Sequence, residues 1–108
     1  MPNVENHEWS YINVPGKTNL VHKTVGQLVT ESAKIYGEKE AVVFLDQNIR
    51  KNFLQINEEA NKMAAALLSI GLQPGDRLAI WGPNVYEWYL TQWATAKAGI
   101  ILVMKLIK

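Results

Sequence analysis

The chain has 108 residues, 48% of them hydrophobic and 19% charged, which is the composition of one small globular domain. Its net charge of +1 removes any strong long-range attraction to nucleic acid or anionic lipid, and the absence of cysteine excludes disulfides, thiolate nucleophiles and cysteine-based zinc sites. No apolar stretch reaches the roughly 18–20 residues that a membrane-spanning helix needs.

Residues 1–23 show no sustained hydrophobic period and include two prolines, so we expect an irregular lead-in. Three side chains in it should cover a surface that the sequence does not identify: Trp9, Tyr11 and Ile12. Glu5, Glu8 and the lack of arginine argue against a secretory signal or a mitochondrial presequence in this segment.

A first helix is predicted from Thr24 to Tyr36. Its apolar residues recur at spacings of about 3.6 residues: Val25, Leu28, Val29, Ile35 and Tyr36. Thr24 and Gln27 form a capping-box pair, and Gly37 ends the helix.

A hairpin and a second helix follow. The β-rich run 41–45, the turn 46–48 and a short strand 49–51 predict the hairpin. Asn52 should cap the helix with Gln55 as its reciprocal partner, and Gly71 should close it. The apolar face is predicted to contain Phe53, Ile56, Ala60, Met63, Leu67 and Ile70, while the side chains pointing away are Glu58, Glu59, Asn61 and Lys62.

The last part of the chain predicts a parallel strand–helix–strand unit with a right-handed crossover. The strands 78–81 and 100–103 are apolar throughout, so both faces of each are expected to be buried. The helix 85–98 is apolar nearly all round, is expected to begin at a capping pair of Asn84 and Glu87, and ends at Gly99. The fold class is α/β, and the strands should need further strands and helices to cover them, so the architecture looks incomplete.

Two short segments could contact a phosphate. The segment 16–18 (Gly-Lys-Thr) matches the end of a phosphate-binding loop, but Tyr11 stands where that loop needs a glycine, and no strand precedes it. At 82–84, between a strand and a helix, backbone N–H groups could gather an anion. We expect Asn84 and Glu87 to cap those groups instead, and Glu87 would repel a phosphate.

Five aromatic residues gather near the end of the chain: Trp81, Tyr86, Trp88, Tyr89 and Trp93. They could line a ligand tunnel or stack a purine, but such clusters more often form core or cover a neighbouring domain, which is the expectation here. His7 and His22 lack partners at ligand spacing, and Glu58 and Glu59 are read as a solvated helix face. The sequence therefore assigns no catalytic residue, no cofactor-binding residue and no metal ligand.

From Thr24 onward, the order of these signals resembles the N-terminal part of the adenylate-forming superfamily, the AMP-forming acyl-CoA synthetases. The matching segments are 24–28, 40–43, the Ala-Leu-Leu-x-x-Gly-Leu helix end at 66–72, the Pro-Gly-Asp-Arg turn at 74–77, 81–84, 86–88 and 94–103. The wording at 68–72, 75–78 and 94–103 is most similar to medium-chain acyl-CoA ligases of the acyl-CoA synthetase family member 2 type, which are mitochondrial.

The resemblance implies an incomplete N-terminal portion of an adenylate-forming enzyme fold: residues 1–23 as lead-in, 24–103 as a partial subdomain and 104–108 as a divergent tail at a truncation. It also implies a parent fatty acid–CoA ligase that uses ATP and Mg²⁺ to make an acyl-adenylate and pyrophosphate, after which coenzyme A displaces AMP. The family's Ser/Thr/Gly-rich phosphate loop, its nucleotide-binding residues and its catalytic lysine have no counterpart in this sequence. We therefore expect this chain to bind none of these cofactors and to be inactive alone.

Three points stay open at the level of sequence. The resemblance suggests a mitochondrial location, yet we expect no targeting presequence in this sequence, and the cytoplasm is otherwise the expected compartment. A non-enzymatic interaction module, associating with the full-length enzyme, is the alternative function. A nucleotide-binding protein is a third reading and rests on the segment 16–18 alone.

Overall fold

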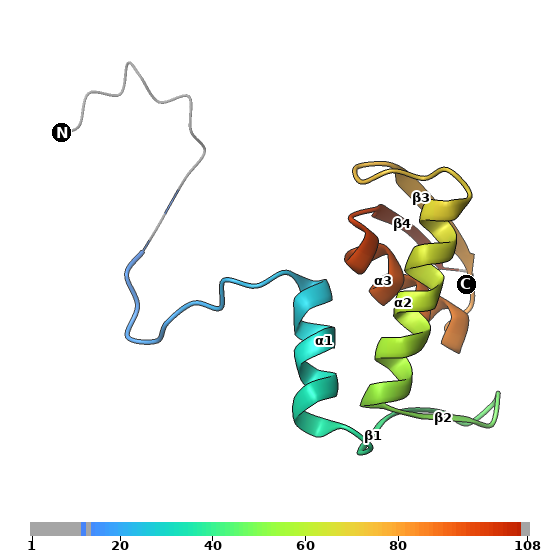
Figure 1. Ribbon diagram of the computed structural model, residues 1–108, viewed down its shortest axis with the longest axis horizontal. Coiled ribbons are helices and arrows are strands. Elements are labelled where there is room, and N and C mark those ends of the chain that lie inside the picture. The colour runs from blue at the N-terminus through green and yellow to red at the C-terminus, as the bar shows by residue number, and fades with distance from the viewer. Residues whose placement is uncertain (1–11, 13, 107–108) are drawn as a thin grey trace.

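The computed structural model describes residues 12 and 14–106, which form three helices and two two-stranded sheets (Figure 1). In chain order the elements are α1 (Val25–Tyr36), β1 (Glu40–Phe44), β2 (Ile49–Asn52), α2 (Phe53–Ser69), β3 (Arg77–Gly82), α3 (Tyr86–Ala98) and β4 (Ile101–Leu106). The predicted α/β class and the order of elements are confirmed. Residues 14–23 form neither helix nor strand and Ile12 is exposed, whereas Trp9 and Tyr11 lie outside the described residues.

Helix α1 begins as predicted but packs through different residues. Thr24 and Gln27 form the reciprocal capping box, and Gly37 ends the helix. The predicted apolar stripe of α1 is largely exposed. The buried residues of this helix are two small ones, Gly26 and Ala33, so the helix packs against its neighbours through that side instead. A side chain on Gly26 would lie 3.1 Å from the backbone of α3, so the glycine permits the close approach of the two helices.

The hairpin and the start of α2 are confirmed. Strands β1 and β2 pair antiparallel, with a register irregularity between Glu40 and Val42. Asn48 adopts a φ of 53° in the turn, which asparagine tolerates better than most residues. Asn52 and Gln55 form the second capping box.

Helix α2 supplies the centre of the core. Its buried residues are Ile56, Ala60, Ala64 and Leu67. Leu67 and Ala64 pack in one cluster with Ala94, Ala98 and Ile100 from the third helix and the segment after it. The prediction that Ile70 belongs to this face is wrong: the helix ends at Ser69 and the Ile70 side chain is exposed.

Strands β3 and β4 pair in parallel, as predicted, with Arg77 opposite Ile101 and Gly82 opposite Leu106. Helix α3 lies between this sheet and the other two helices, which explains its buried residues on several sides. The predicted burial of both strand faces is wrong for the described residues. Exposed and half-buried residues alternate along β3, because α3 covers one face and the other face is open.

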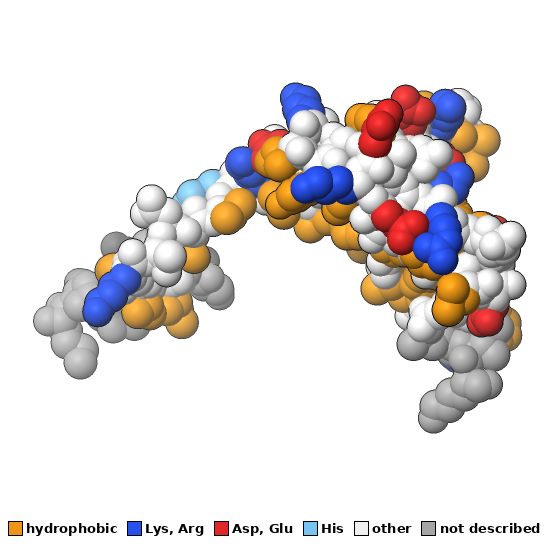
Figure 2. Space-filling view, turned by 90° about the horizontal axis from the view of Figure 1, so that it is seen from below, with side chains coloured by type: hydrophobic (Ala, Val, Ile, Leu, Met, Phe, Trp, Pro, Cys, Tyr) orange, Lys and Arg blue, Asp and Glu red, His pale blue; other side chains and the backbone are white. Residues whose placement is uncertain are grey.

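The surface of the described region carries both charged and apolar side chains. In Figure 2 many apolar side chains lie along the inner side of the arc that the view shows, and charged groups lie mostly along its outer side. None of the described helices has the combination of length and apolar character that a bilayer-crossing helix requires. Large exposed apolar side chains lie in the lead-in, on α1, in the hairpin, on α2 and the turn after it, and on the β3–β4 sheet.

Candidate functional site

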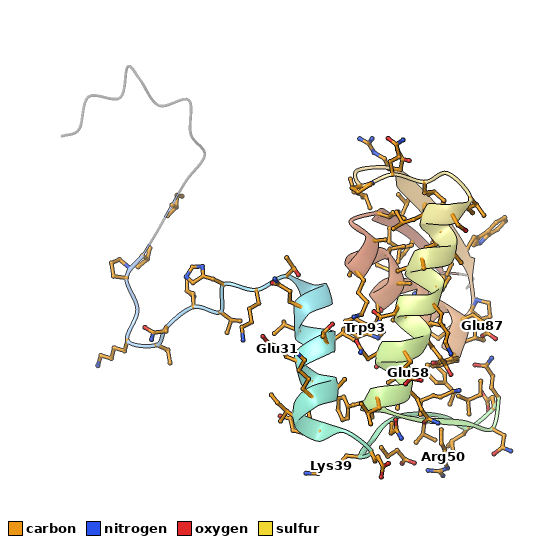
Figure 3. The ribbon with its side chains drawn as sticks, in the orientation of Figure 1. Glu31, Lys39, Arg50, Glu58, Glu87 and Trp93 are labelled. Carbon is orange, nitrogen blue, oxygen red and sulfur yellow. The ribbon has the colours of Figure 1, made fainter. Side chains whose placement is uncertain are left out.

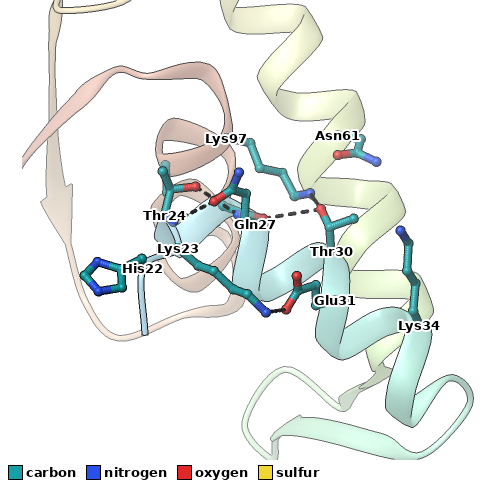
Figure 4. A pocket seen from close by; sticks show the side chains of 11 residues that line it. His22, Lys23, Thr24, Gln27, Thr30, Glu31, Lys34, Asn61 and Lys97 are labelled. Atoms are coloured by element: carbon teal, nitrogen blue, oxygen red, sulfur yellow. Dashed lines mark hydrogen bonds and ion pairs between the residues drawn. The ribbon is translucent and has the colours of Figure 1, made fainter. Parts of the chain in front are cut away.

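A polar groove of about 680 Å³ lies where α1 meets α2 and α3 (Figure 4). Lys97 reaches into it from α3, and its Nζ donates to Thr30 Oγ1 at 2.7 Å and to Asn57 Oδ1 at 2.8 Å. These bonds connect all three helices through one ammonium group. Burial lowers the pKa of Lys97, because desolvation disfavours the charged form and both acceptors are neutral.

The rim of this groove carries ionisable side chains from the lead-in and α1: His22, Lys23, Glu31 and Lys34. Lys23 Nζ lies 2.6 Å from the carboxylate of Glu31, and both side chains are well exposed, so the pair contributes at most about 1 kcal/mol. The capping box already satisfies amides at the start of α1. In this groove Lys97 and Lys23 are therefore engaged in bonds within the chain, and the bonds of Lys97 connect the three helices.

The loop between β3 and α3 is closed by a residue that the sequence analysis missed. Gln47, in the hairpin turn, accepts a hydrogen bond from Tyr86 N at 2.6 Å and donates through Nε2 to Glu87 Oε2 at 2.9 Å. Val85 is the N-cap residue and provides no side-chain bond, so the predicted Asn84–Glu87 capping pair is wrong. The hydrogen bond from Gln47 lowers the pKa of Glu87.

The same hydrogen bonds argue against an anion site at residues 82–84. The amide of Tyr86 is bonded to Gln47, and a carboxylate from Glu87 stands beside it. An approaching phosphate would have to displace the Gln47 side chain from the amide and would be repelled by the Glu87 carboxylate. The sequence could not reveal the cap, because Gln47 lies 39 residues from the amide that it satisfies.

Most of the aromatic cluster is core, as expected. The Phe44 ring lies 5.8 Å from Tyr86 and 5.9 Å from Tyr89, and Tyr89 meets Trp93 edge-to-face at 5.5 Å. Trp88 is buried. These contacts hold the hairpin against α3, which is the packing role of large aromatic side chains.

Trp81 is the exception within this group. Its side chain on β3 is 74% exposed, and Lys105 Nζ lies 5.9 Å from the centroid of its ring. The sequence offered no signal that would separate Trp81 from its aromatic neighbours, because the difference depends on which face of β3 meets α3.

The predicted solvent exposure of Glu59 is wrong. This side chain was predicted to point into solvent beside Glu58, but its carboxylate accepts hydrogen bonds from the Tyr86 hydroxyl and from Lys51 Nζ, the latter at 2.5 Å. Burial alone would raise the pKa of Glu59, yet these two bonds and the positive charges of Lys51 and Lys62 hold it below the ordinary value. Burial, and then the hydrogen bond to the Glu59 carboxylate, raise the pKa of Tyr86.

A second, apolar groove of about 350 Å³ lies between the three helices on another side of α1. Its lining residues are Val25, Leu28, Val29, Ser32, Phe53, Ile56, Tyr89 and Trp93. Trp93, which lies between α1 and α2 in Figure 3, has the one buried side-chain polar atom among the described residues that lacks a hydrogen-bond partner, its Nε1. The groove offers mainly apolar area, and its lining residues include no carboxylate, imidazole or amine that could activate the hydroxyl groups of Ser32 and Tyr89.

The remaining candidates do not assemble into a site. Residues 16–18 lie in an exposed bend with no strand before them in the described segment, so the phosphate-loop reading gains no support. His22 is exposed, and His7 lies outside the described residues. The described residues contain no group of three or more histidine, aspartate and glutamate side chains that could hold a metal. The described residues do contain three polar side chains whose hydrogen bonds connect separate helices and strands: Gln47, Glu59 and Lys97.

Comparison with known proteins shows the family of this chain. The AMP-binding enzyme family matches residues 29–105. The mouse protein named medium-chain acyl-CoA ligase ACSF2, mitochondrial, is 53% identical over 94 residues, which are 87% of this chain and 15% of the mouse protein. The human protein of the same name is 52% identical over the same lengths of both chains.

Solved structures agree with the sequence comparison. A fatty acyl CoA synthetase from Mycobacterium tuberculosis superposes with a TM-score of 0.73 at 28% identity, covering 76% of this chain and 16% of that structure. The chain thus spans less than one fifth of the length of these relatives. The predicted similarity to N-terminal parts of adenylate-forming enzymes is confirmed.

Proposed function

Because the chain belongs to the AMP-binding enzyme family, we propose that it forms an N-terminal scaffold segment of a fatty acid–CoA ligase. The observation that carries this proposal is the 53% identity to a medium-chain acyl-CoA ligase over 87% of the chain. The whole enzyme would join a medium-chain fatty acid to coenzyme A in two steps. Attack of the carboxylate on the α-phosphate of ATP gives an acyl-adenylate and pyrophosphate, and the thiol of coenzyme A then displaces AMP.

The segment's own contribution is packing. Lys97 connects the three helices, Gln47 caps α3 from the hairpin, and Glu59 connects α2 to Tyr86. None of these groups is arranged to transfer a proton to a substrate or to attack one. ATP, Mg²⁺ and coenzyme A would therefore be held by other parts of the enzyme, and the relatives' name makes mitochondria the compartment to test.

We expect the 108-residue chain alone to be inactive. The sequence contains no Ser/Thr/Gly-rich phosphate loop, and in the polar groove Lys23 and Lys97 are already bonded within the chain, Lys23 to Glu31 and Lys97 to Thr30 and Asn57. Incubating the purified chain with ATP, octanoate and labelled pyrophosphate should produce no exchange of label into ATP. Exchange above that of a heat-denatured sample would contradict this part of the proposal.

The positive test is a chimera. In the mouse enzyme, the 94-residue segment that matches this chain would be replaced by the corresponding residues of this chain. We expect the chimera to form octanoyl-CoA, AMP and pyrophosphate with the parent's preference for octanoate over palmitate. A folded, monodisperse chimera that cannot form acyl-CoA would refute the assignment as an interchangeable scaffold segment.

The alternative, a non-enzymatic interaction module, is favoured by one observation, the exposed apolar residues on α1 and on the β3–β4 sheet. It predicts a defined complex between this chain and an intact acyl-CoA ligase. Size-exclusion chromatography of the chain with the intact mouse enzyme would detect such a complex. Elution of the two proteins at their separate volumes would remove this alternative.

A further inference from the structure

The amine of Lys97 lies in the polar groove between the three helices, where it is partly shielded from water. Its two acceptors, Thr30 Oγ1 at 2.7 Å and Asn57 Oδ1 at 2.8 Å, are both neutral. None of the ion pairs found among the described residues includes Lys97. Desolvation without a compensating negative charge lowers the pKa of Lys97, so the uncharged amine is more populated than in a solvated lysine.

The hydrogen bonds of Lys97 suit the uncharged amine. The ammonium form of lysine has three N–H donors and no acceptor, whereas the amine has two donors and one lone pair. The Thr30 hydroxyl can donate to Gly26 O at 3.3 Å, so its oxygen is left to accept from Lys97. Thr30 and Asn57 therefore use both N–H groups of the amine and leave its lone pair unengaged.

The groove gives a reagent access to this amine. It encloses about 680 Å³, and Figure 4 shows Lys97 reaching from α3 toward Thr30 on α1. Helix α2 contributes neutral asparagine side chains to these surroundings. The ionisable side chains that line the rest of the groove are His22, Lys23, Glu31 and Lys34. The carboxylate among them, Glu31, is paired with Lys23 at 2.6 Å, so the amine of Lys97 keeps its neutral neighbours.

Resting on the proposed function, we propose that Lys97 is a site of covalent modification by an acyl-CoA thioester, the product of the whole enzyme. The amine nitrogen attacks the thioester carbonyl carbon, an N–C bond forms and the C–S bond breaks. Coenzyme A leaves as a thiolate and takes up, through solvent, the proton that the nitrogen loses. The resulting amide keeps one N–H, so at most one of the two bonds of Lys97 can remain. Acyl-CoA acts here as a reagent on the chain, and no step of the ligase reaction involves Lys97.

The test supplies the acyl donor directly. The purified chain is incubated with octanoyl-CoA and without ATP, so that no acyl-adenylate can form, and octanoylation of each lysine is followed by peptide mass spectrometry. Lys17, which is exposed in the lead-in, is the internal reference. We expect Lys97 to be octanoylated at least about threefold faster than Lys17, because the uncharged amine is the attacking form. Unfolding in guanidinium chloride should abolish the difference, because packing then no longer desolvates Lys97.

A matched pair of variants tests whether the surroundings of Lys97 control its reactivity. Asn57→Asp turns the acceptor at 2.8 Å into a carboxylate, which stabilises the ammonium form. Asn84→Asp makes the same change in the exposed loop before α3, away from the residues that line the groove. We expect Asn57→Asp to slow octanoylation of Lys97 by about threefold or more and to move its pH profile to higher pH. Asn84→Asp should leave both the rate and the profile unchanged.

The outcomes separate the possibilities. If Lys97 reacts no faster than Lys17, or if its excess persists in the unfolded chain, the inference is overturned. Equal rates at Lys97 in the two variants would refute it as well, because its neighbours would then not control the amine. If circular dichroism shows that Asn57→Asp does not fold, the comparison of the folded and unfolded wild type decides the question. The acyl donor is added ready-made, so an inactive chimera and an unmodified Lys97 are distinguishable failures.

Discussion

Gln47 Oε1 accepts a hydrogen bond from the backbone amide of Tyr86 at 2.6 Å, and this bond joins the hairpin turn to the start of α3. The first amides of a helix have no partner inside the helix, and a side-chain cap normally comes from the residue just before it. Here Val85 cannot supply one, so a residue from another element takes that role. The orientation of the hairpin and the start of α3 are therefore fixed by the same side chain.

The first prediction concerns this cap. Gln47→Ala should lower the free energy of unfolding by about 1 kcal/mol, since removal of a helix cap typically costs 0.5–2 kcal/mol. Urea titration followed by circular dichroism measures the change. Glu58→Ala, on an exposed part of α2, is the control and should change stability little. Equal stability of the Gln47→Ala variant and the wild type would show that water replaces the cap without loss.

The second prediction concerns the Tyr86 hydroxyl. Tyr86→Phe keeps the ring in its contact with Phe44 and removes only the donor to the Glu59 carboxylate. We expect a loss of about 1–2 kcal/mol, because hydrogen bonds to charged groups contribute more than neutral ones but this carboxylate is only half-buried. Tyr89→Phe is the matched control, because the hydrogen bonds found among the described residues do not include one from the Tyr89 hydroxyl. A smaller loss for Tyr86→Phe than for the control would contradict this role.

The third prediction is a pH dependence. The pKa of Glu59 is lower in the folded chain than in the unfolded chain, where a glutamate has a pKa of about 4.3. Its contribution to stability is therefore complete above about pH 4.3 and is lost as the pH falls through the lower folded-state value. Urea titrations from pH 7 to pH 3 should show a smaller decline for Glu59→Gln than for the wild type. Parallel curves would show that the Lys51 and Tyr86 bonds do not favour the ionised carboxylate.

An interaction could be predicted from the sequence when its two residues lie close together in the chain, and was missed when they lie far apart. Both capping boxes, at Thr24 and Asn52, were predicted correctly because each partner lies three residues away. The cap from Gln47 and the bond from Tyr86 to Glu59 were missed, because 39 and 27 residues separate their partners. The side chains that a local pattern assigns to solvent can be used by an element that comes later in the chain.

The apolar patterns show the same limit. The period in α1 correctly predicted a helix, yet its large side chains remain exposed and Gly26 makes the close contact. The continuous apolar character of β3 and β4 correctly predicted a parallel pair, whereas burial of their second face depends on a covering layer that the described chain does not supply. Periodicity thus identifies the element, and the identity of its neighbours decides which face is buried.

The last prediction tests the contact between α1 and α3. A Cβ atom on Gly26 would lie 3.1 Å from both Ala96 O and Lys97 Cα, which are backbone atoms that cannot rotate away. Valine has a higher helix propensity than glycine, so in an open position this change would stabilise α1. We nevertheless expect Gly26→Val to lower the free energy of unfolding by about 1–3 kcal/mol, the usual cost of overpacking.

The same change should weaken the bond between Lys97 and Thr30, because α1 must move away from α3 to admit the side chain. Gly82→Val is the control, since a Cβ there would meet nothing within 4 Å. Urea titration compares the two variants, and hydrogen exchange at the amides of α1 locates the loss. If Gly26→Val were as stable as Gly82→Val, the helices would have room to separate without cost, and the close approach of α1 to α3 at Gly26 would not contribute to stability.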